Sequence, residues 1–364
     1  MGVYLFLAIS PLIFLPIVDL YCKSSINENN KAKKIYLFLC GTVLFLIIAL
    51  RNKNLGSSDS SNYYNNWMFL SGLNFQDAKI YIANARMESG YLYTVWILSR
   101  VFVDPQWCFI LSGLLFSISI CRFIYLNSED VALSLVMYVC LGLYGFMVQG
   151  LRQSIAMSIC LFAIELVKKK KPIKFLFIVL LACLYHESAV VFVLVYLLQW
   201  KKFSSEYKFQ IAFLAGVLLC LTPLIISIGN QILDSNYTVP VDGGGWVATA
   251  IYFIIIISAF IFLSNKKKLH PKLFNEKEKN YVLFLSITVL GACFYLMRYF
   301  GTLAIERISF YFMFGQIILL PNVINTFDKK TKIIINFIVI ILSIALFIYR
   351  FIGSDLVPYT FFGG

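Results

Sequence analysis

Charged residues are scarce in this sequence. They make up 13% of its 364 residues, and only 18 residues are Asp or Glu. An ordinary soluble domain carries about 25% charged residues, so this chain cannot cover a surface that faces water. Histidine is rarer still, with two in the chain. The scarcity of charge excludes a soluble globular protein, and it makes each charged position informative.

Several motifs of catalysis and cofactor binding are also missing. The sequence has no Gly-rich nucleotide loop, no GxSxG and no HExxH. Its nine Cys are scattered, mostly within apolar segments, with no CxxC pair and no Cys/His cluster. The acids expected on the outer side of the membrane are few and dispersed. We therefore expect no cofactor, no metal site and no activated nucleotide donor.

Apolar runs fill most of the chain. Hydrophobic residues make up 60% of it, and the mean hydropathy is +0.82. Runs of roughly 20 apolar residues suit an α-helix that crosses ~30 Å of hydrocarbon, and they are far too long for the strands of a membrane barrel. The predicted fold is an all-α polytopic membrane protein, with about 12 transmembrane helices in a single transmembrane domain over residues 1–364. The predicted spans include residues 35–50, 108–126, 130–148 and 209–229.

The net charge of +13 is explained by topology. Of the 23 Lys, 21 fall in five clusters, at 23–34, 168–174, 201–208, 266–279 and 329–332. Cytoplasmic loops collect Lys and Arg, so these clusters are expected inside. A nucleic-acid partner is then unnecessary. Seven of the eight Arg lie on or near the outer side in this topology, with Arg122 as the exception.

A long polar stretch, RNKNLGSSDSSNYYNNW, begins at Arg51 and falls outside in this topology. It opens a first external loop over residues 51–106. That loop contains the apolar run ESGYLYTVWILSRVF, which hydropathy alone would make a span. Counting it as a span would put Lys168–Lys171 outside, against the charge rule. We therefore expect in-plane helices at the membrane surface in this loop. A second external loop is expected over residues 230–246.

Four polar clusters are expected on the outer face, around Arg51, Arg152, His186 and Arg307. Ionisable groups near a membrane more often face a wet cavity than lipid, so one outward-facing cavity is the economical prediction. The planar fork of Arg can pair with phosphate oxygens and suits a diphosphate. The alternatives are snorkelling at the interface or a pair with an acid. Glu306 is the candidate partner for Arg298 or Arg307.

A candidate base for a sugar hydroxyl is His186, because an imidazole titrates near neutral pH. The alternative for His186 is a hydrogen-bonded residue at a hairpin tip. Asp59 and Glu187 compete as the base. The run Asp242–Trp246 predicts a turn followed by a helix start. It is either a flexible loop or backbone close to a ligand, with Trp246 stacking on sugar.

These clusters carry a family pattern. Residues 51–63 read R-N-x-x-x-G-x-x-D-x-x-N-Y, LRQSIA follows at 151–156, His186 precedes Ser188 and Ala189, and ERISFYFMFGQIILLP occupies 306–321. In this order the sequence resembles the EpsG family of bacterial polysaccharide-synthesis membrane proteins, which are related to Wzy-type polymerases. One departure is that two Ser separate Gly56 from Asp59, where such loops often read G-x-D.

The resemblance implies a GT-C-like fold and a glycosyltransferase that joins undecaprenyl-diphosphate-linked oligosaccharide repeat units into a surface polysaccharide. It implies an active site on the outer face of the bacterial cytoplasmic membrane. The partners it implies are that lipid-linked glycan and the bilayer, and a chain-length regulator is left open. The implied site residues are His186, Asp59 or Glu187 as base, Arg51, Arg152, Arg298 and Arg307 for diphosphate, and Asn62, Tyr63, Gln153 and Trp246 for sugar.

Other functions stay open at this point. A flippase or exporter of the same lipid-linked glycans would need alternating access, usually with internal repeats and polar groups at mid-membrane. No convincing repeat is visible, and Glu165 is almost the only acid within a predicted span. A membrane acyltransferase could use His186 as base, with acyl-CoA entering from the cytoplasm. A scaffold for an export complex is the third alternative. The sequence does not separate a polymerase from a ligase.

Overall fold

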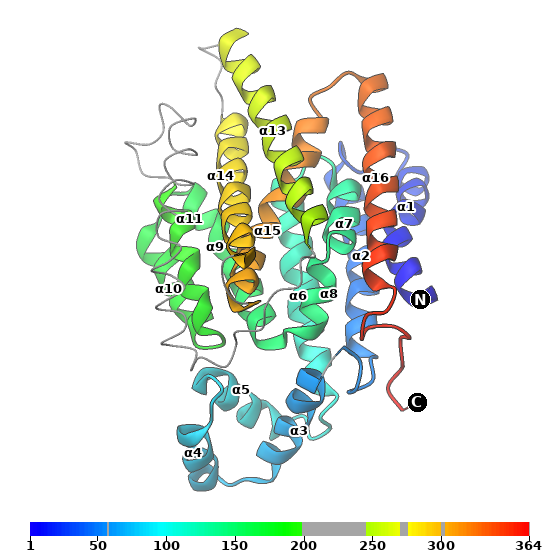
Figure 1. Ribbon diagram of the computed structural model, residues 1–364. Coiled ribbons are helices and arrows are strands. Elements are labelled where there is room, and N and C mark those ends of the chain that lie inside the picture. The colour runs from blue at the N-terminus through cyan, green and yellow to red at the C-terminus, as the bar shows by residue number, and fades with distance from the viewer. Residues whose placement is uncertain (57, 199–244, 270–275, 300–302, 364) are drawn as a thin grey trace. The chain divides into compact units, whose positions relative to one another are not determined.

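The computed structural model describes residues 1–56, 58–198, 245–269, 276–299 and 303–363. All regular elements in these ranges are helices (Figure 1). They are α1 (Gly2–Cys22), α2 (Asn30–Ala49), α3 (Ser58–Gly72), α4 (Phe75–Asn84), α5 (Ser89–Ser99), α6 (Trp107–Asn127), α7 (Val131–Cys140), α8 (Leu143–Gln149), α9 (Leu151–Lys168), α10 (Pro172–Cys183), η1 (Glu187–Phe192), α11 (Val193–Leu197), α13 (Trp246–Leu269), α14 (Glu276–Leu296), η3 (Met297–Tyr299), α15 (Leu303–Ile324) and α16 (Lys329–Phe351).

Several of these helices are long and apolar enough to cross a membrane. Among the described residues there are five, namely α1, α2, α6, α16 and residues 306–324 of α15, and the bent pair α7–α8 makes a sixth. This agrees with a multi-pass membrane protein. The sequence predicts about 12 spans, which is more than the candidates among the described residues. The predicted span at 209–229 and residues 230–244 of the predicted second external loop lie outside the described residues.

The chain divides into two compact units. The first contains residues 1–164, 176–190 and 333–364, and the second contains residues 165–175 and 191–332. In the second unit α13, α14 and α15 pack against one another. Phe312 of α15 stacks on Phe294 of α14 with ring centroids 5.4 Å apart, and on Phe192 of η1 at 6.3 Å. Aromatic packing therefore joins three elements of this unit.

Small residues let the long helices of the first unit approach closely. A side chain at Gly41 of α2 would come within 2.9 Å of the Cys121 sulfur on α6, and one at Gly113 of α6 would come within 3.0 Å of Ile48 on α2. Close backbone approach of this kind is how helices associate in lipid, where burial from water supplies no driving force. In α1, Pro11 lacks an N–H, and the hydroxyl of Ser10 donates to the Leu7 carbonyl instead, at 3.0 Å.

The segment predicted as one helix over residues 130–148 is broken. It bends by 52° between α7 and α8, where Gly142 has φ +95°. Such a φ is costly for any residue with a Cβ, which accounts for glycine here. The break frees carbonyls that lipid cannot satisfy. Arg350 of α16 donates to the Leu141 carbonyl at 2.7 Å, and Arg51 donates to the Val148 carbonyl at the end of α8.

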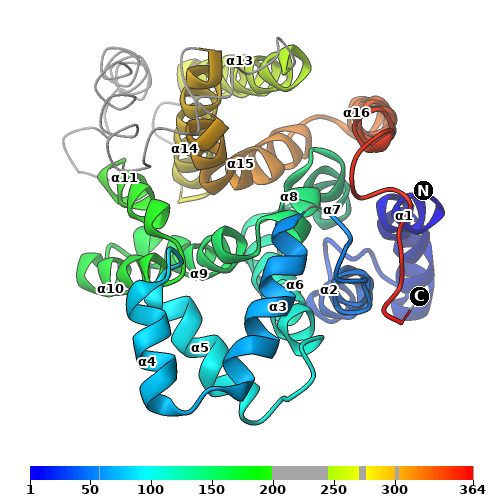
Figure 2. The ribbon, with the colours of Figure 1, turned by 60° about the horizontal axis from the view of Figure 1, so that its bottom comes forward.

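Helices α3, α4 and α5 lie beyond one end of α2 and α6 (Figures 1 and 2). Helix α5 packs against α3 and α4, and α3 also contacts α6. With 11 residues, α5 is too short to cross ~30 Å of hydrocarbon, so ESGYLYTVWILSRVF forms no span by itself. The segment predicted as an external loop therefore carries three helices. Their place at the membrane surface stays a prediction.

Candidate functional site

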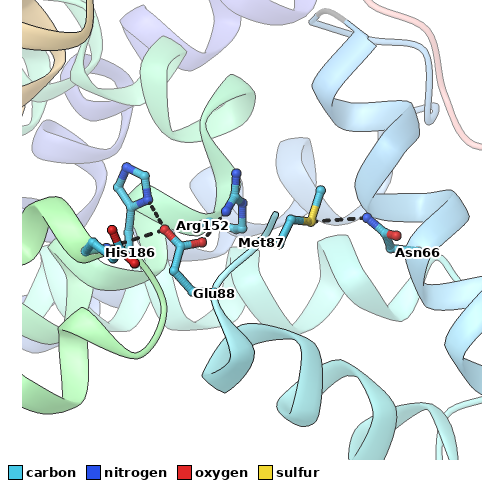
Figure 3. A network of polar contacts seen from close by, with 6 residues as sticks. Asn66, Met87, Glu88, Arg152 and His186 are labelled. Atoms are coloured by element: carbon cyan, nitrogen blue, oxygen red, sulfur yellow. Dashed lines mark hydrogen bonds and ion pairs between the residues drawn. The ribbon is translucent and has the colours of Figure 1, made fainter. Parts of the chain in front are cut away.

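One carboxylate, that of Glu88, contacts groups from two distant parts of the first unit (Figure 3). Glu88 precedes α5, and its Oε2 forms an ion pair with Nη1 of Arg152 on α9. Its Oε1 lies 2.6 Å from Nδ1 of His186 and accepts a longer hydrogen bond, at 3.4 Å, from the backbone N–H of Glu187. A predicted cation and a predicted base therefore meet on the same acid.

The environment keeps Glu88 ionised. Burial opposes ionisation, but the hydrogen bond from His186 and the charge of Arg152 outweigh it and lower the pKa of Glu88 to about 2. The three side chains stay partly open, with exposed fractions of 12% for Glu88, 22% for Arg152 and 28% for His186. At neutral pH Glu88 is therefore a carboxylate paired with the Arg152 cation, and a ligand can approach both side chains.

The position of Glu88 depends on close packing between α5 and the end of α10. The Tyr91 N–H donates to the Leu184 carbonyl at 3.1 Å. A Cβ at Gly90 would lie 2.5 Å from that same carbonyl oxygen and 2.5 Å from the Leu184 Cβ. His186 follows two residues later, where α10 has ended and its backbone N–H still bonds the Ala182 carbonyl at 3.1 Å. Glycine at position 90 thus brings Glu88 beside His186.

Replacing Gly90 by Ala is therefore expected to lower the free energy of unfolding by about 1–3 kcal/mol, because Leu184 presents backbone that cannot move aside cheaply. Thermal unfolding in detergent measures the change. Gly72→Ala, at the end of α3, is the matched control because a Cβ there meets nothing within 4 Å. Equal stability of the two variants would contradict the packing argument.

Residues of α3 extend the cluster. The charge of Arg152 acts on the Tyr63 hydroxyl, and the Tyr63 ring packs edge-on against Tyr91 at 5.9 Å. Burial raises the pKa of Tyr63, Arg152 opposes that shift, and Asp59 adds to it from one helical turn away. Asp59 and Arg152 therefore both act electrostatically on Tyr63.

A neutral network holds the segment before Glu88. Asn66 of α3 donates through Nδ2 to the Met87 sulfur at 3.3 Å, as Figure 3 shows. Its Oδ1 accepts from the Tyr81 hydroxyl of α4 at 3.0 Å. Met87 immediately precedes Glu88, so α3 and α4 both contribute to placing the acid.

A second cation–acid pair lies in the second unit. Arg298 Nη1 donates to the Tyr295 hydroxyl at 2.6 Å and to Glu306 Oε1 at 3.0 Å. The pairing of Glu306 with Arg298 considered from the sequence is confirmed. Gly245 lies against the same guanidinium, since a Cβ there would be 2.6 Å from Nη1.

A comparison with models of protein families shows to which family the chain belongs. The model of the EpsG family matches residues 34–361, which is most of the chain. The chain belongs to the EpsG family. No curated protein and no solved structure matches it. The match confirms the resemblance predicted from the sequence and extends it to residue 361. The EpsG family is linked to exopolysaccharide synthesis.

The structure of this EpsG-family protein brings together only part of the predicted site. Arg152, His186 and Tyr63 meet around Glu88, and Asp59 lies one turn from Tyr63. Glu187 contributes its backbone N–H, while its side chain is exposed. Arg298, Arg307 and Trp246 belong to the second unit, where Arg307 is exposed and Trp246 is 66% exposed. Their meeting with Arg152 stays a prediction.

Arg51 has a different environment. Its side chain is fully buried, its guanidinium lies 4.0 Å from the Phe109 ring centroid, and its described hydrogen bond goes to backbone. Gln106 supports the same turn by donating to the Ala49 and Arg51 carbonyls. Gln153 is also buried, at 4% exposure, and Asn62 is exposed on α3. The geometry therefore centres on Arg152, with Arg51 supporting the helix ends.

Sequence reasoning missed Glu88 in this EpsG-family protein. It compared Asp59, Glu187 and Glu306 and treated ESGYLYTVWILSRVF only as an in-plane helix. The available signal was an acid directly before an apolar run, where a helix N-terminus favours negative charge. Within the described residues, no group of three or more His, Cys, Asp or Glu side chains is placed to hold a metal ion.

Proposed function

We propose that this EpsG-family protein is a polysaccharide polymerase. Its donor is a glycan chain linked to undecaprenyl diphosphate, and its acceptor is the next lipid-linked repeat unit. The reaction takes place on the outer face of the bacterial cytoplasmic membrane. An acceptor hydroxyl attacks the anomeric carbon of the donor, the glycosidic bond forms, and the bond to the diphosphate breaks. The polyprenyl diphosphate leaves with the electron pair of that bond.

The observation that carries the proposal is the joining of Arg152 and His186 by Glu88. A glycosyl transfer of this kind needs a cation for the departing diphosphate and a base for the attacking hydroxyl. The sequence offered both groups, 34 residues apart in the chain, and the fold places them on one ionised carboxylate. Membership in a family linked to exopolysaccharide synthesis supports the same chemistry.

Glu88 suits His186 to the role of base. An ionised carboxylate against Nδ1 favours the tautomer that carries its proton there. Nε2 is then the nitrogen that can accept a proton from the acceptor hydroxyl. The imidazolium that forms is stabilised by the negative charge of Glu88. Asp59 and Glu187 remain competing bases. His186 is preferred because the Glu88 carboxylate lies 2.6 Å from its Nδ1 and orients the ring.

Arg152 suits the leaving group. A guanidinium has five N–H donors, and the ion pair to Glu88 uses Nη1. Its Nε is buried without a hydrogen-bond partner among the described residues. A diphosphate oxygen would satisfy donors of this kind and gain a charge-assisted hydrogen bond. Asn62 and Tyr63 on α3 and Gln153 on α9 are the candidate sugar contacts of the first unit in this proposal.

Reconstitution tests the function directly. Purified protein in liposomes is supplied with undecaprenyl-diphosphate repeat units, with neither nucleotide sugars nor acyl-CoA present. We expect a ladder of lipid-linked products that lengthens by whole repeat units on a gel, because the donor already carries its leaving group. A flippase would move the substrate across the bilayer without joining units, and an acyltransferase would leave the glycan length unchanged. Either result would contradict the proposal.

A further inference from the structure

The first unit contains an apolar cavity of about 330 Å³. Its walls come from four helices, α3, α5, α6 and α9, together with Tyr185 after α10. The side chains used in the argument are Trp67, Thr94, Leu115, Leu151, Ile155 and Tyr185. This volume lies at the lower end of the ~300–1,000 Å³ range of small-ligand sites. The cavity is therefore large enough to take part of a ligand.

The cavity adjoins the Glu88 cluster. Leu151 and Tyr185 line it, and each directly precedes a member of the cluster, Arg152 and His186. Tyr91, three residues after Glu88, also lines it. A ligand with its anionic end at Arg152 would thus place whatever is attached to that end at the mouth of an apolar chamber.

Most polar groups in the walls already have partners within the protein, and the exception is the buried Tyr91 hydroxyl, which has no hydrogen-bond partner among the described residues. Thr94 donates to the Gly90 carbonyl at 2.8 Å and lies 3.0 Å from the Tyr185 hydroxyl. Ser112 donates to the Cys108 carbonyl at 2.6 Å, and the Trp67 indole N–H donates to the Phe102 carbonyl at 3.0 Å. Satisfied polar groups gain little from a polar ligand, so the chamber favours an apolar occupant.

We propose that this cavity holds the isoprene units nearest to the diphosphate of the polyprenyl donor. The inference rests on the proposed function, and it adds the place of the lipid chain. An amphiphile with one anionic head and one chain matches a site in which the residue before a partly exposed Arg152 lines an apolar chamber. Burial of the chain supplies affinity, while Arg152 sets which end of the ligand faces the acceptor.

Binding to the full-length protein in detergent tests the assignment, with farnesyl diphosphate and inorganic diphosphate as probes. Calorimetry should show farnesyl diphosphate binding about 100-fold more tightly, because inorganic diphosphate has no chain to bury. Leu115→Trp fills the cavity and should reduce that ratio to less than about fivefold. The matched control is Leu114→Trp, next to it on α6 but 44% exposed, which should keep the full ratio.

Other outcomes overturn the assignment. They are an equal affinity for both probes in the unaltered protein, a full ratio in Leu115→Trp, or equal binding of lysophosphatidate, which would mean that any membrane acyl chain is accepted. If Leu115→Trp fails to fold, Ile155→Phe on α9 fills the same space from another wall. These binding measurements need no turnover. If the two probes bind equally while the product ladder still forms, this lipid site is refuted and the polymerase is not. If the ladder is absent while farnesyl diphosphate still binds more tightly than inorganic diphosphate, the polymerase is refuted.

Discussion

Glu88→Gln is expected to lower the rate of polymerisation by about 10³-fold. The neutral amide cannot stabilise an imidazolium at His186, and it leaves Arg152 without its counter-charge. It can also present an N–H to His186 Nδ1, which would favour the tautomer with its proton on the wrong nitrogen. The rate of ladder growth from lipid-linked repeat units in liposomes measures the effect.

Asp77→Asn is the control for this variant. Asp77 lies on α4 in the same segment, which is predicted to be external, and its exposed carboxylate accepts a hydrogen bond from Asn74. Its loss should leave the rate unchanged. The double variant Glu88→Gln with His186→Ala should be no slower than the slower single variant, because residues that act as a unit are not additive. Full activity of Glu88→Gln would contradict a role of the Glu88 cluster in catalysis.

Arg152→Ala is expected to leave products of a single repeat unit. We expect a fall of about 10²–10³-fold in polymerisation, as when one fixed donor to a developing charge is removed. The protein should still insert, because the side chain is partly exposed and its interactions among the described residues are with Glu88 and Tyr63. Polymer length on a gel and the amount of protein in the membrane measure the two parts of this prediction.

Arg100→Ala supplies the comparison. Arg100 lies in the same segment, which is predicted to be external. It packs over the Trp96 ring at 4.9 Å and donates to the Ser71 carbonyl. It should keep normal polymer length, since it has no place in the cluster. Arg152→Lys should keep part of the activity, because an ammonium retains the charge but not the fork. Normal polymer length in Arg152→Ala would refute the assignment of Arg152 as a diphosphate ligand.

The helices could be located from the sequence because the length of each apolar run is set mainly by the thickness of hydrocarbon that the helix must cross. The runs predicted at 35–50 and 108–126 correspond to α2 and α6, and their edges shift by a few residues at most. The broken span is different. Gly142 gives a local reason for a bend, but Arg350, more than 200 residues later, satisfies the carbonyl that the break exposes. Hydropathy contains no information on such a partner.

The contrast between Arg51 and Arg152 makes the same point for the site. Both were predicted on the outer side as diphosphate ligands, and both follow the end of a helix. Packing gives them different neighbours, because Arg51 is enclosed by Phe109 and the end of α8, whereas Arg152 stays partly open beside Glu88. Residue type and membrane side limit the candidates, and burial distinguishes among them.

The sequence by itself determined a multi-pass helical membrane protein, its EpsG family membership and the candidates Arg152 and His186. These follow from composition, charge distribution and short motifs, which are properties of neighbouring residues. Only the tertiary structure decided that Glu88 joins them, since it lies 64 residues from Arg152 and 98 from His186. Their meeting depends on the contact of Gly90 with Leu184, and the distance between two side chains is set by packing rather than by chain order.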